Sequence, residues 1–499
     1  GLNQSFGNFT WSCAGQTAAL SLENNITAVN GSFTVSATNN QNLILANTAT
    51  ARTLTIGRDL NILGGTFIAA NNTGAATLAV GRDAYITGGT LTMKNAAGAA
   101  ALNITGNFTQ TGGTLNQWAA NTTATSTMSV GGDYSITVGT HNLSAVAATG
   151  SLTVAGNFSA TGGTITETST GAGSIAFNGT GNTQTISSGA TISNNINFTV
   201  NTGAFIQFNA ATTQLTGAGT FTLQSGTEIG IRATDGIAAS GASGHVRVTG
   251  TRTYDANATY IYNGTAAQTT GNGLPATISN LTINNAAGVS QTNTSLTVTN
   301  TLDLTSGIYT SNTSLVIAAT GDIVNATPLS YVNGPLSLVY TGIGSKTFPI
   351  GKGGNYRPVS LQYTALTGTS TVSAEQFETS MTGTFPTFVT VFPARKWTLS
   401  QTGGSAFSFD ITLLGSGFSP SGLPVMLRNN GTIDATSAAF TSPNFYSAAG
   451  YTSFGEFALG DQCVAATINA PTVTNVSCNG NSDGAISITT TGGSAPLTY

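Results

Sequence analysis

Three aspartates recur at one position of a repeated phrase, and their side chains are the chain's best candidates for chemistry. Asp59, Asp83 and Asp133 occupy this position, and Arg58 and Arg82 directly precede two of them. Carboxylates that converge with a cationic side chain act as general acids and bases, and clustered carboxylates bind Ca²⁺. The recurrence therefore raises two chemical hypotheses, a Ca²⁺ site and a catalytic site.

Asparagine takes the same position in two other copies of the phrase, at Asn107 and Asn157. Asp and Asn both bind backbone N–H groups in turns, whereas an amide in place of a carboxylate weakens a metal site. The exchange favours a structural ladder of turn side chains. Ca²⁺ binding by Asp59, Asp83 and Asp133 stays open as an alternative, as does catalysis, and no other cofactor is expected.

The elements that position this column are five copies of a phrase that begins Leu-Thr-Ile-Gly-Arg-Asp. The copies start at Leu54, Leu78, Leu102, Met128 and Leu152, in steps of 24, 24, 26 and 24 residues. Apolar residues alternate with polar ones at fixed places in each copy, which predicts short strands with one face inward. A period of this length is typical of one solenoid turn, so the sequence predicts a parallel β-helix of about 24 residues per coil.

A threonine column accompanies the repeats. The phrase reaches Gly-Gly-Thr in four copies and Val-Gly-Thr in the other, and the glycines indicate corners. We expect the threonines to form a hydroxyl ladder and to be the surface-contact residues: Thr66, Thr90, Thr114, Thr140 and Thr164. Binding of ice or crystalline polysaccharide is an alternative for this column, although only two copies contain the Thr-x-Thr pair usual in ice binders.

The solenoid is expected to span most of the chain. Residues 1–25 are rich in aromatic side chains and are predicted to cap its open first turn. Residues 26–327 are predicted to form the β-helix in about a dozen coils. They comprise the five repeats at 54–173 and a duplicated block at 174–326, in which short phrases return 81 to 85 residues later.

Proline marks the next boundary, because only one of the 12 prolines, Pro275, precedes residue 328. Residues 328–462 combine strand patterns with Gly, Pro and Asn turns, which predicts an antiparallel β-sandwich. Residues 463–499 begin a small Ig-like β module, with a strand candidate at Ala485–Thr489. The expected fold class is therefore all-β.

The composition excludes several classes of function. Charged residues make up 6% of the chain and the net charge is −4, so no basic stripe for nucleic acid and no polybasic membrane patch exists. No run of about 18 apolar residues is present, which argues against membrane insertion. Contact with partners must depend on shape, hydroxyls, amides and a few aromatic rings.

The histidines and one basic–aromatic triplet show no catalytic pattern. His141 falls in an otherwise apolar column and is predicted to be a packing histidine. His245 stands near Arg247 and Arg252 in a stretch predicted to be a solvated loop. Arg395-Lys396-Trp397 is predicted to be a sandwich strand in preference to a carbohydrate platform. No serine-hydrolase, zinc-protease or phosphate-binding motif occurs.

The chain contains three cysteines. Cys463 and Cys478 are 15 residues apart, a spacing that a disulfide closes in an oxidising compartment, and we predict that bond. Cys13 is left over. It is expected to be a buried free thiol, with intermolecular pairing as the alternative.

The last segment carries a more specific signature. It contains Val476-Ser-Cys-Asn-Gly480, Ser482-Asp-Gly484 and Gly492-Gly-Ser-Ala-Pro-Leu-Thr-Tyr499. This segment, residues 464–499, resembles the SprB-type repeat of giant cell-surface adhesins of gliding Bacteroidota. It departs from the usual pattern at Leu497, where family members have an aromatic residue, and members usually continue past the final Tyr with Ser-Trp.

The resemblance implies a secreted protein at the extracellular cell surface, exported by the type 9 secretion system. It implies a long filament with a distal N-terminal end, used for adhesion and gliding. The predicted function is thus a non-enzymatic adhesin tip that contacts surface glycans or abiotic surfaces. Secretion and motility machinery would be engaged through other parts of the parent protein. A polysaccharide lyase or hydrolase of the β-helix type and a purely architectural filament cap stay open as alternatives.

Overall fold

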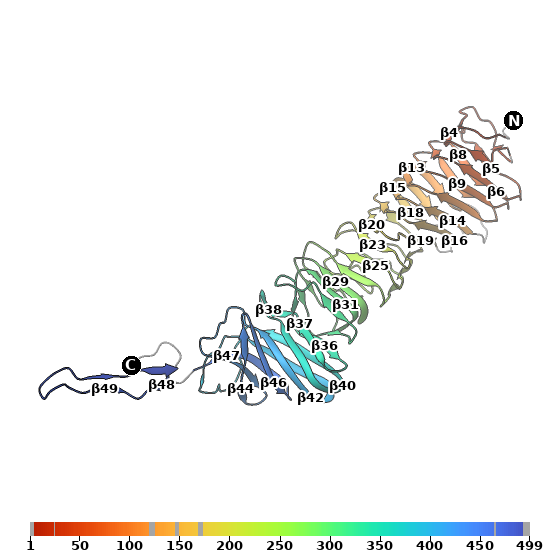
Figure 1. Cartoon of the computed structure of the whole chain (residues 1–499). Coiled ribbons are helices and arrows are strands. Elements are labelled where there is room, and N and C mark those ends of the chain that lie inside the picture. Colours follow the sequence, from red (N-terminus) through yellow and green to blue (C-terminus); the bar gives the residue numbers. More distant parts are fainter. Residues whose placement is uncertain are drawn as a thin grey trace. The chain divides into compact units, whose positions relative to one another are not determined.

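The computed structural model consists of strands joined by turns (Figure 1). It describes residues 4–23, 25–118, 125–144, 149–167, 173–463 and 466–492. Contacts divide the chain into two units, residues 1–293 and 294–499. The parallel solenoid has about 13 turns of about 24 residues, and antiparallel sheets follow it. The predicted all-β class and parallel β-helix are confirmed.

Each turn of the repeats places its strands in two sheets, and in both sheets the strands of successive turns pair in parallel. The ten-stranded sheet contains the strand that opens each copy, beginning with β6 (Arg52–Ile56), β9 (Ala76–Val80) and β12 (Ala100–Ile104). In this sheet Leu54 pairs with Leu78 and Leu78 with Leu102. The register continues to Met128 and Leu152. The first residues of the five copies therefore lie one above another, as the period predicts.

The solenoid interior is a stack of apolar side chains contributed by equivalent positions. Phe108 stacks on Tyr134 with ring centroids 5.2 Å apart, and Tyr134 stacks on Phe158 at 5.3 Å. These residues come from β13 (Phe108–Asn116), β15 (Tyr134–Asn142) and β17 (Phe158–Ala160), which pair in parallel. All three rings are fully buried. No single turn encloses them, so each turn depends on its neighbours.

The prediction that residues 1–25 form a cap is wrong. β1 (Phe9–Ser12) pairs in parallel with β4 (Phe33–Ala37), and β2 (Leu20–Ser21) pairs in parallel with β5 (Asn42–Ala46). These N-terminal strands are therefore the first turn of the solenoid. The Phe9 ring stacks on Phe33 at 5.1 Å, so an aromatic residue predicted to cover the core is part of its column.

Parallel pairing in the second unit extends past the predicted boundary at residue 327. β36 (Leu336–Tyr340) pairs in parallel with β33 (Ser314–Ile317), and β38 (Ile350–Lys352) pairs in parallel with β35 (Val332–Asn333). β36 also pairs antiparallel with β40 (Val359–Phe377). The same strand thus belongs to the parallel stack and to the antiparallel region.

Two 19-residue strands, β40 and β42 (Lys396–Leu414), build the antiparallel region. One end of β42 pairs with β46 (Asn444–Tyr451), and its other end pairs with β47 (Gly455–Gln462). Phe409 on β42 meets Phe457 on β47 edge to face at 6.1 Å, and both rings are fully buried in the core of this region. The predicted antiparallel region is therefore present, beginning later than residue 328.

The C-terminal module is described as two antiparallel strand pairs. β48 (Ala466–Ile468) pairs with β51 (Thr490–Gly492), and β49 (Thr472–Thr474) pairs with β50 (Ala485–Ser487). The predicted strand at 485–489 overlaps β50. Residues 493–499, which carry most of the last sequence motif, lie outside the described residues.

Replacing Phe158 with alanine tests the stacked core. We expect Phe158→Ala to lower the free energy of unfolding by about 3–5 kcal/mol, because a buried ring is lost from between two turns. Ser159→Ala on the same strand is the control, since Ser159 faces outward and the change should cost less than about 0.5 kcal/mol. Urea unfolding of both variants is the measurement, and equal losses would contradict the core assignment.

Candidate functional site

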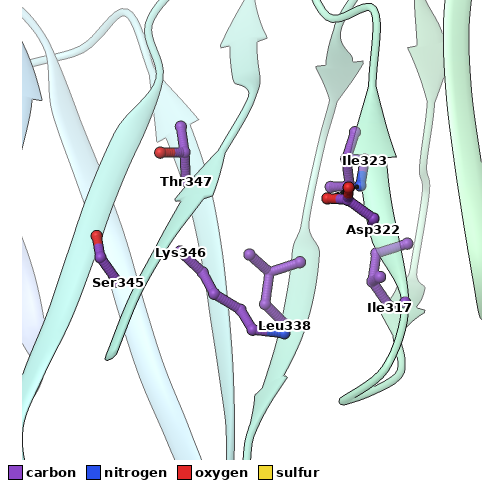
Figure 2. Close-up of a pocket in the computed structure, with 8 residues that line it drawn as sticks. Ile317, Asp322, Ile323, Leu338, Ser345, Lys346 and Thr347 are labelled. Carbon is purple, nitrogen blue, oxygen red and sulfur yellow. Dashed lines mark hydrogen bonds between the residues drawn. The ribbon is translucent and has the colours of Figure 1, made fainter. Parts of the chain in front are cut away.

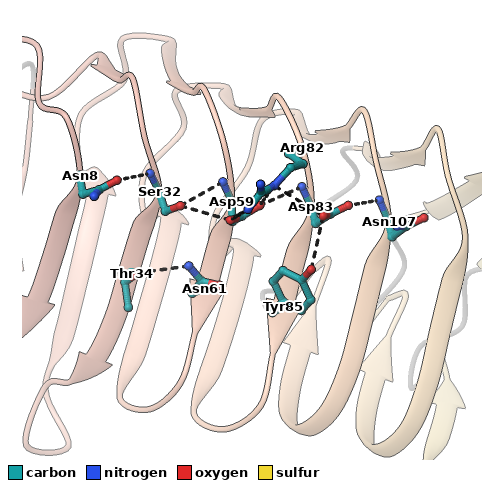
Figure 3. Close-up of polar contacts among 9 residues, drawn as sticks. All are labelled: Asn8, Ser32, Thr34, Asp59, Asn61, Arg82, Asp83, Tyr85 and Asn107. Carbon is teal, nitrogen blue, oxygen red and sulfur yellow. Dashed lines mark hydrogen bonds and ion pairs between the residues drawn. The ribbon is translucent and has the colours of Figure 1, made fainter.

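The Asp and Asn side chains of the repeats form a hydrogen-bonded ladder along one corner of the solenoid (Figure 3). Asp83 Oδ1 accepts from the backbone N–H of Asn107 at 2.7 Å, and Asn107 Oδ1 accepts from that of Asp133 at 2.8 Å. Asp133 Oδ1 accepts from the N–H of Asn157 at 2.7 Å. Each side-chain oxygen thus binds a backbone N–H group of the following turn. That N–H group has no partner in the sheets. The predicted turn ladder is confirmed.

The ladder is longer than the repeated phrase. Asn8 Oδ1 accepts from the N–H of Ser32 at 2.9 Å, and Ser32 Oγ accepts from that of Asp59 at 3.4 Å. At the other end, Asn157 Oδ1 accepts from the N–H of Thr185 at 2.8 Å. Sequence reasoning missed these members because the residue type changes and the separations become 27 and 28 residues. Asn8 and Ser32 share one signal, a short polar side chain just before a strand, whereas Thr185 lies within β20 (Thr183–Ser188).

Arg82 reaches across this corner to Asp59. Its Nε donates to Asp59 Oδ1 at 2.7 Å, and its Nη2 pairs with Asp59 Oδ2. The hydrogen bond from Arg82 lowers the pKa of the Asp59 carboxyl, although burial opposes that effect. In the next turn, the hydroxyl of Tyr85 donates to Asp83 Oδ2 at 3.3 Å. Carboxylates held in this way act as fixed acceptors for neighbouring groups.

The three aspartates of the Ca²⁺ alternative, Asp59, Asp83 and Asp133, do not converge on one point. Asn107 separates Asp83 from Asp133 in the ladder, and the carboxylates face backbone N–H groups. Within the described ranges, no group of three or more His, Cys, Asp or Glu side chains is placed to hold a metal ion. Calcium needs six to eight oxygen ligands around one point, whereas stacking spreads these acids along an axis.

The threonine column is in register, as predicted. Successive members pair across adjacent strands, and all five are half-buried: Thr66, Thr90, Thr114, Thr140 and Thr164. Thr191 continues the column after Thr164 and is exposed. Thr191 was missed because it follows Gly-Ala instead of Gly-Gly. The column supplies regularly spaced hydroxyls along the solenoid.

A second hydroxyl-bearing face was not predicted. The outward positions of the ten-stranded sheet, from Thr53 to Thr253, hold only small residues in the part that the structure describes. They are Thr53, Thr55, Thr77, Ala79, Ala101, Asn103, Thr125, Thr127, Ser129, Thr149, Ser151, Thr153, Ser174, Ala176, Asn197, Thr199, Thr222 and Thr253. The sequence signal was the polar half of each strand's alternation. This face offers hydroxyls and methyl groups without charge.

His141 is a buried packing residue, as predicted. The Tyr134 hydroxyl lies 2.8 Å from His141 Nδ1, and Gln117 Nε2 lies 3.0 Å from His141 Nε2. Burial lowers the pKa of His141 to about 3, so the ring is neutral near pH 7. It is enclosed in the core and unavailable for surface chemistry.

His245 is buried, so the prediction of a solvated loop is wrong. Its Nε2 accepts from the backbone N–H groups of Arg232 at 2.9 Å and Ala233 at 2.8 Å. Nδ1 therefore carries the proton and donates to the carbonyl of Thr213 at 2.8 Å. The ring also stacks on Phe208 at 4.1 Å. Burial lowers the pKa of His245 to about 4.

A pocket of about 360 Å³ lies in the second unit beside β34 (Asp322–Val324) and β37 (Gly344–Phe348) (Figure 2). Lys346 Nζ donates to the carbonyl of Ala319 at 3.2 Å, and burial lowers the pKa of Lys346. The lining offers the Asp322 carboxylate, this amine and two hydroxyls. It lacks the second carboxyl group that glycoside cleavage requires.

Trp397 is not an exposed carbohydrate platform. Its side chain is buried, and Nε1 donates to the carbonyl of Arg357 at 2.8 Å. Arg395 is also buried, and it donates to the carbonyl of Ser416 at 2.7 Å. Lys396 and Trp397 open the antiparallel strand β42 as predicted, and Arg395 directly precedes that strand.

The structure contains no Cys463–Cys478 disulfide, contrary to the prediction. Cys463 directly follows β47, whereas Cys478 lies in the connection between β49 and β50. The antiparallel strand pairs of the C-terminal module separate the two positions, which a count of intervening residues does not reveal. Cys13 is a half-buried free thiol.

Comparison with known proteins identifies one segment of the chain. Residues 470–499 match the SprB repeat family. This match confirms the predicted SprB-type repeat. No curated protein matches the chain, and no solved structure matches it.

An SprB repeat suggests a cell-surface adhesin-like protein, and the parallel solenoid fits that class. Such repeats are typical of surface proteins. No apolar helix of membrane-spanning length occurs in the part of the chain that the structure describes.

Asp133 provides a test of the ladder. We expect Asp133→Ala to lower the free energy of unfolding by about 0.5–1.5 kcal/mol, because the N–H of Asn157 loses its acceptor. Asp133→Asn keeps an acceptor oxygen and should cost less than about 0.5 kcal/mol. Urea unfolding with and without millimolar CaCl₂ is the measurement. A calcium-dependent gain in stability that Asp133→Asn abolishes would support the Ca²⁺ alternative.

The buried His245 should make stability depend on pH. Its pKa is about 4 in the folded chain and about 6.5 when exposed, so only the unfolded chain takes up a proton between these values. The stabilisation is complete above pH 6.5 and is lost as pH falls toward 4, by about 3 kcal/mol. His245→Gln should flatten this part of the unfolding free energy plotted against pH. His141 is present in the wild type and in His245→Gln, so its contribution cancels when the two are compared. Identical pH profiles of the unfolding free energy in these two proteins would contradict the prediction.

Proposed function

We propose that this chain is a non-enzymatic adhesin at the cell surface and forms the distal end of a long filament used for attachment and gliding. The observation that carries the proposal is the SprB repeat at 470–499, which follows a solenoid with hydroxyl columns. Secretion by the type 9 system and coupling to motility machinery would depend on other parts of the parent protein.

The mechanism is multivalent contact by a regular surface. A single protein hydroxyl that replaces its hydrogen bond to water with one to a glycan hydroxyl contributes little binding free energy. The solenoid repeats its threonine column turn after turn at about 4.8 Å, so many such contacts form together and their sum is an avidity. With charged residues at 6% of the chain, binding to surface glycans or abiotic surfaces should depend only weakly on salt.

The enzyme alternative finds no supporting cluster of three or more acids or histidines placed together among the residues that the structure describes. A polysaccharide lyase or hydrolase on a β-helix needs carboxylates that converge with a base, and the aspartates of the repeats are engaged in the ladder. The purely architectural alternative, a filament cap without a ligand, differs from the adhesin only in binding. Binding is therefore what the decisive experiment must measure.

Removing hydroxyls from the threonine column tests the adhesin. We expect Thr→Val at residues 66, 90, 114, 140 and 164 together to reduce retention on glycan-coated and abiotic surfaces at least about fivefold, because avidity multiplies small losses. Valine keeps the shape and the strand preference of threonine. The matched control is Thr→Val at residues 53, 55, 77, 127 and 153, which removes five hydroxyls from the other sheet.

Surface retention of the purified chain and both variants is the measurement, and thermal melting checks that each variant is folded. Loss in the control alone would move the contact to the ten-stranded sheet. No retention of the wild-type chain on any surface would reject the adhesin in favour of the architectural cap. Release of oligosaccharides from acidic glycans would instead support the enzyme.

A further inference from the structure

Tyr446 borders a shallow hollow of about 540 Å³ on the antiparallel region of the second unit. The hollow is lined by Thr436, Ser437 and Tyr446, together with alanines at 438, 439, 448 and 449. Tyr446 is 40% exposed, whereas the other two aromatic residues of β46, Phe445 and Tyr451, are buried. An exposed ring beside methyl and hydroxyl groups is a combination that the packing of the sandwich does not require.

A bulge in β46 shapes this hollow. Phe409 pairs with Tyr451 and Ile411 pairs with Ser447, so residues 448–450 stand opposite the single residue Asp410. Gly450 has a φ of +59°, a conformation that favours glycine and lets the strand leave its ladder. Bulges of this kind re-aim side chains and are enriched beside functional sites.

Asp410 holds the bulge and the ring together. Its Oδ1 accepts from the N–H of Gly450 at 3.2 Å, and its Oδ2 accepts from the hydroxyl of Tyr446 at 3.2 Å. The ring is therefore fixed at its polar tip and exposed along its body. A fixed ring loses little conformational freedom when a ligand packs on it.

The chemistry of the lining fits a sugar. One face of a sugar ring presents C–H groups that pack on an aromatic face, and its rim presents hydroxyls. Ser437 and the remaining lone pairs of Asp410 are suitable partners for those hydroxyls. No lysine or arginine lines the hollow, and the nearest charge shown is the Asp410 carboxylate that accepts from the Tyr446 hydroxyl. An anionic sugar would therefore find no compensating positive charge.

A peptide strand fits this place poorly. β46 already pairs with β42 on one edge and with β45 (Ala439–Thr441) on the other. An added strand therefore finds no unpaired edge at Tyr446, and a shallow surface offers no deep apolar pocket for a side chain. The observations favour a saccharide.

We propose that the hollow at Tyr446 binds a neutral sugar unit of a surface glycan, with Tyr446 as the stacking platform and Asp410 as its positioning residue. This site deepens the proposed adhesin function and rests on it. It would add a specific contact to the distributed hydroxyl contacts of the solenoid.

The experiment measures binding of the full chain to arrays of neutral and acidic oligosaccharides, followed by calorimetry with the best neutral binder. Tyr446→Ala should weaken neutral-sugar binding at least about tenfold, and Tyr446→Phe should retain most of it because the ring remains. The matched control is Tyr85→Ala, which removes another tyrosine that donates to an aspartate, at 3.3 Å, outside the hollow. Tyr85→Ala should leave the affinity unchanged.

Two further variants test charge and access. Asp410→Asn keeps an acceptor oxygen and removes the charge, so binding to acidic sugars should rise relative to neutral ones. Ala439 is exposed and pairs with Tyr446 across β45 and β46. Ala439→Arg therefore fills the hollow while keeping both partners of the Tyr446–Asp410 hydrogen bond, and it should abolish binding even if Tyr446→Ala fails to fold.

Unchanged neutral-sugar affinity in folded Tyr446→Ala and in Ala439→Arg would overturn the site and leave the adhesin proposal standing. Attachment to abiotic surfaces without any glycan binding would also overturn the sugar site and keep the adhesin proposal. Binding of peptides but of no sugar would have the same consequence. Failure of the wild-type chain to attach to anything would reject both proposals.

Discussion

Parallel pairing of each turn with its neighbours in one register is the interaction on which the rest of the structure depends. A strand shifted by one residue would turn its inward side chains outward, so the register is held wherever one face is buried. Leu54, Leu78 and Leu102 lie in line for this reason, and so do the rings of Phe108 and Tyr134. The backbone ladder and the apolar column support each other. Neither forms within a single turn.

The same stacking explains why the recurrent aspartates do not converge on a common centre. A residue that recurs once per turn is placed along the solenoid axis, about 4.8 Å from its equivalent. That separation lets Asp83 and Asp133 each serve one N–H of the following turn. Asn107 performs the same task without a charge, which accounts for the exchange between the two residue types.

The parallel stack changes into an antiparallel region through a shared strand. β36 is the last partner of β33 and at the same time the first antiparallel neighbour of β40. Because β36 pairs on both edges, its backbone N–H and C=O groups have partners. At an open end of a solenoid these groups would be exposed. The antiparallel strands beyond it are free of the 24-residue repeat. They carry the bulge at residues 448–450 and the hollow at Tyr446, a local site of a kind that strict repetition disfavours.

The sequence by itself determined the period, the inward positions, the threonine column and the SprB repeat, because each depends on residues close together in the chain or on repetition of one phrase. Tertiary structure alone decided features that depend on partners far apart in sequence. Phe9 joined the core because Phe33 stacks on it, and His245 was buried by contacts with Thr213 and Phe208. Strand pairing likewise kept Cys463 apart from Cys478, whatever their spacing in the chain. Periodicity reports which face of a strand is inward, but only the pairing of distant strands fixes what that face meets.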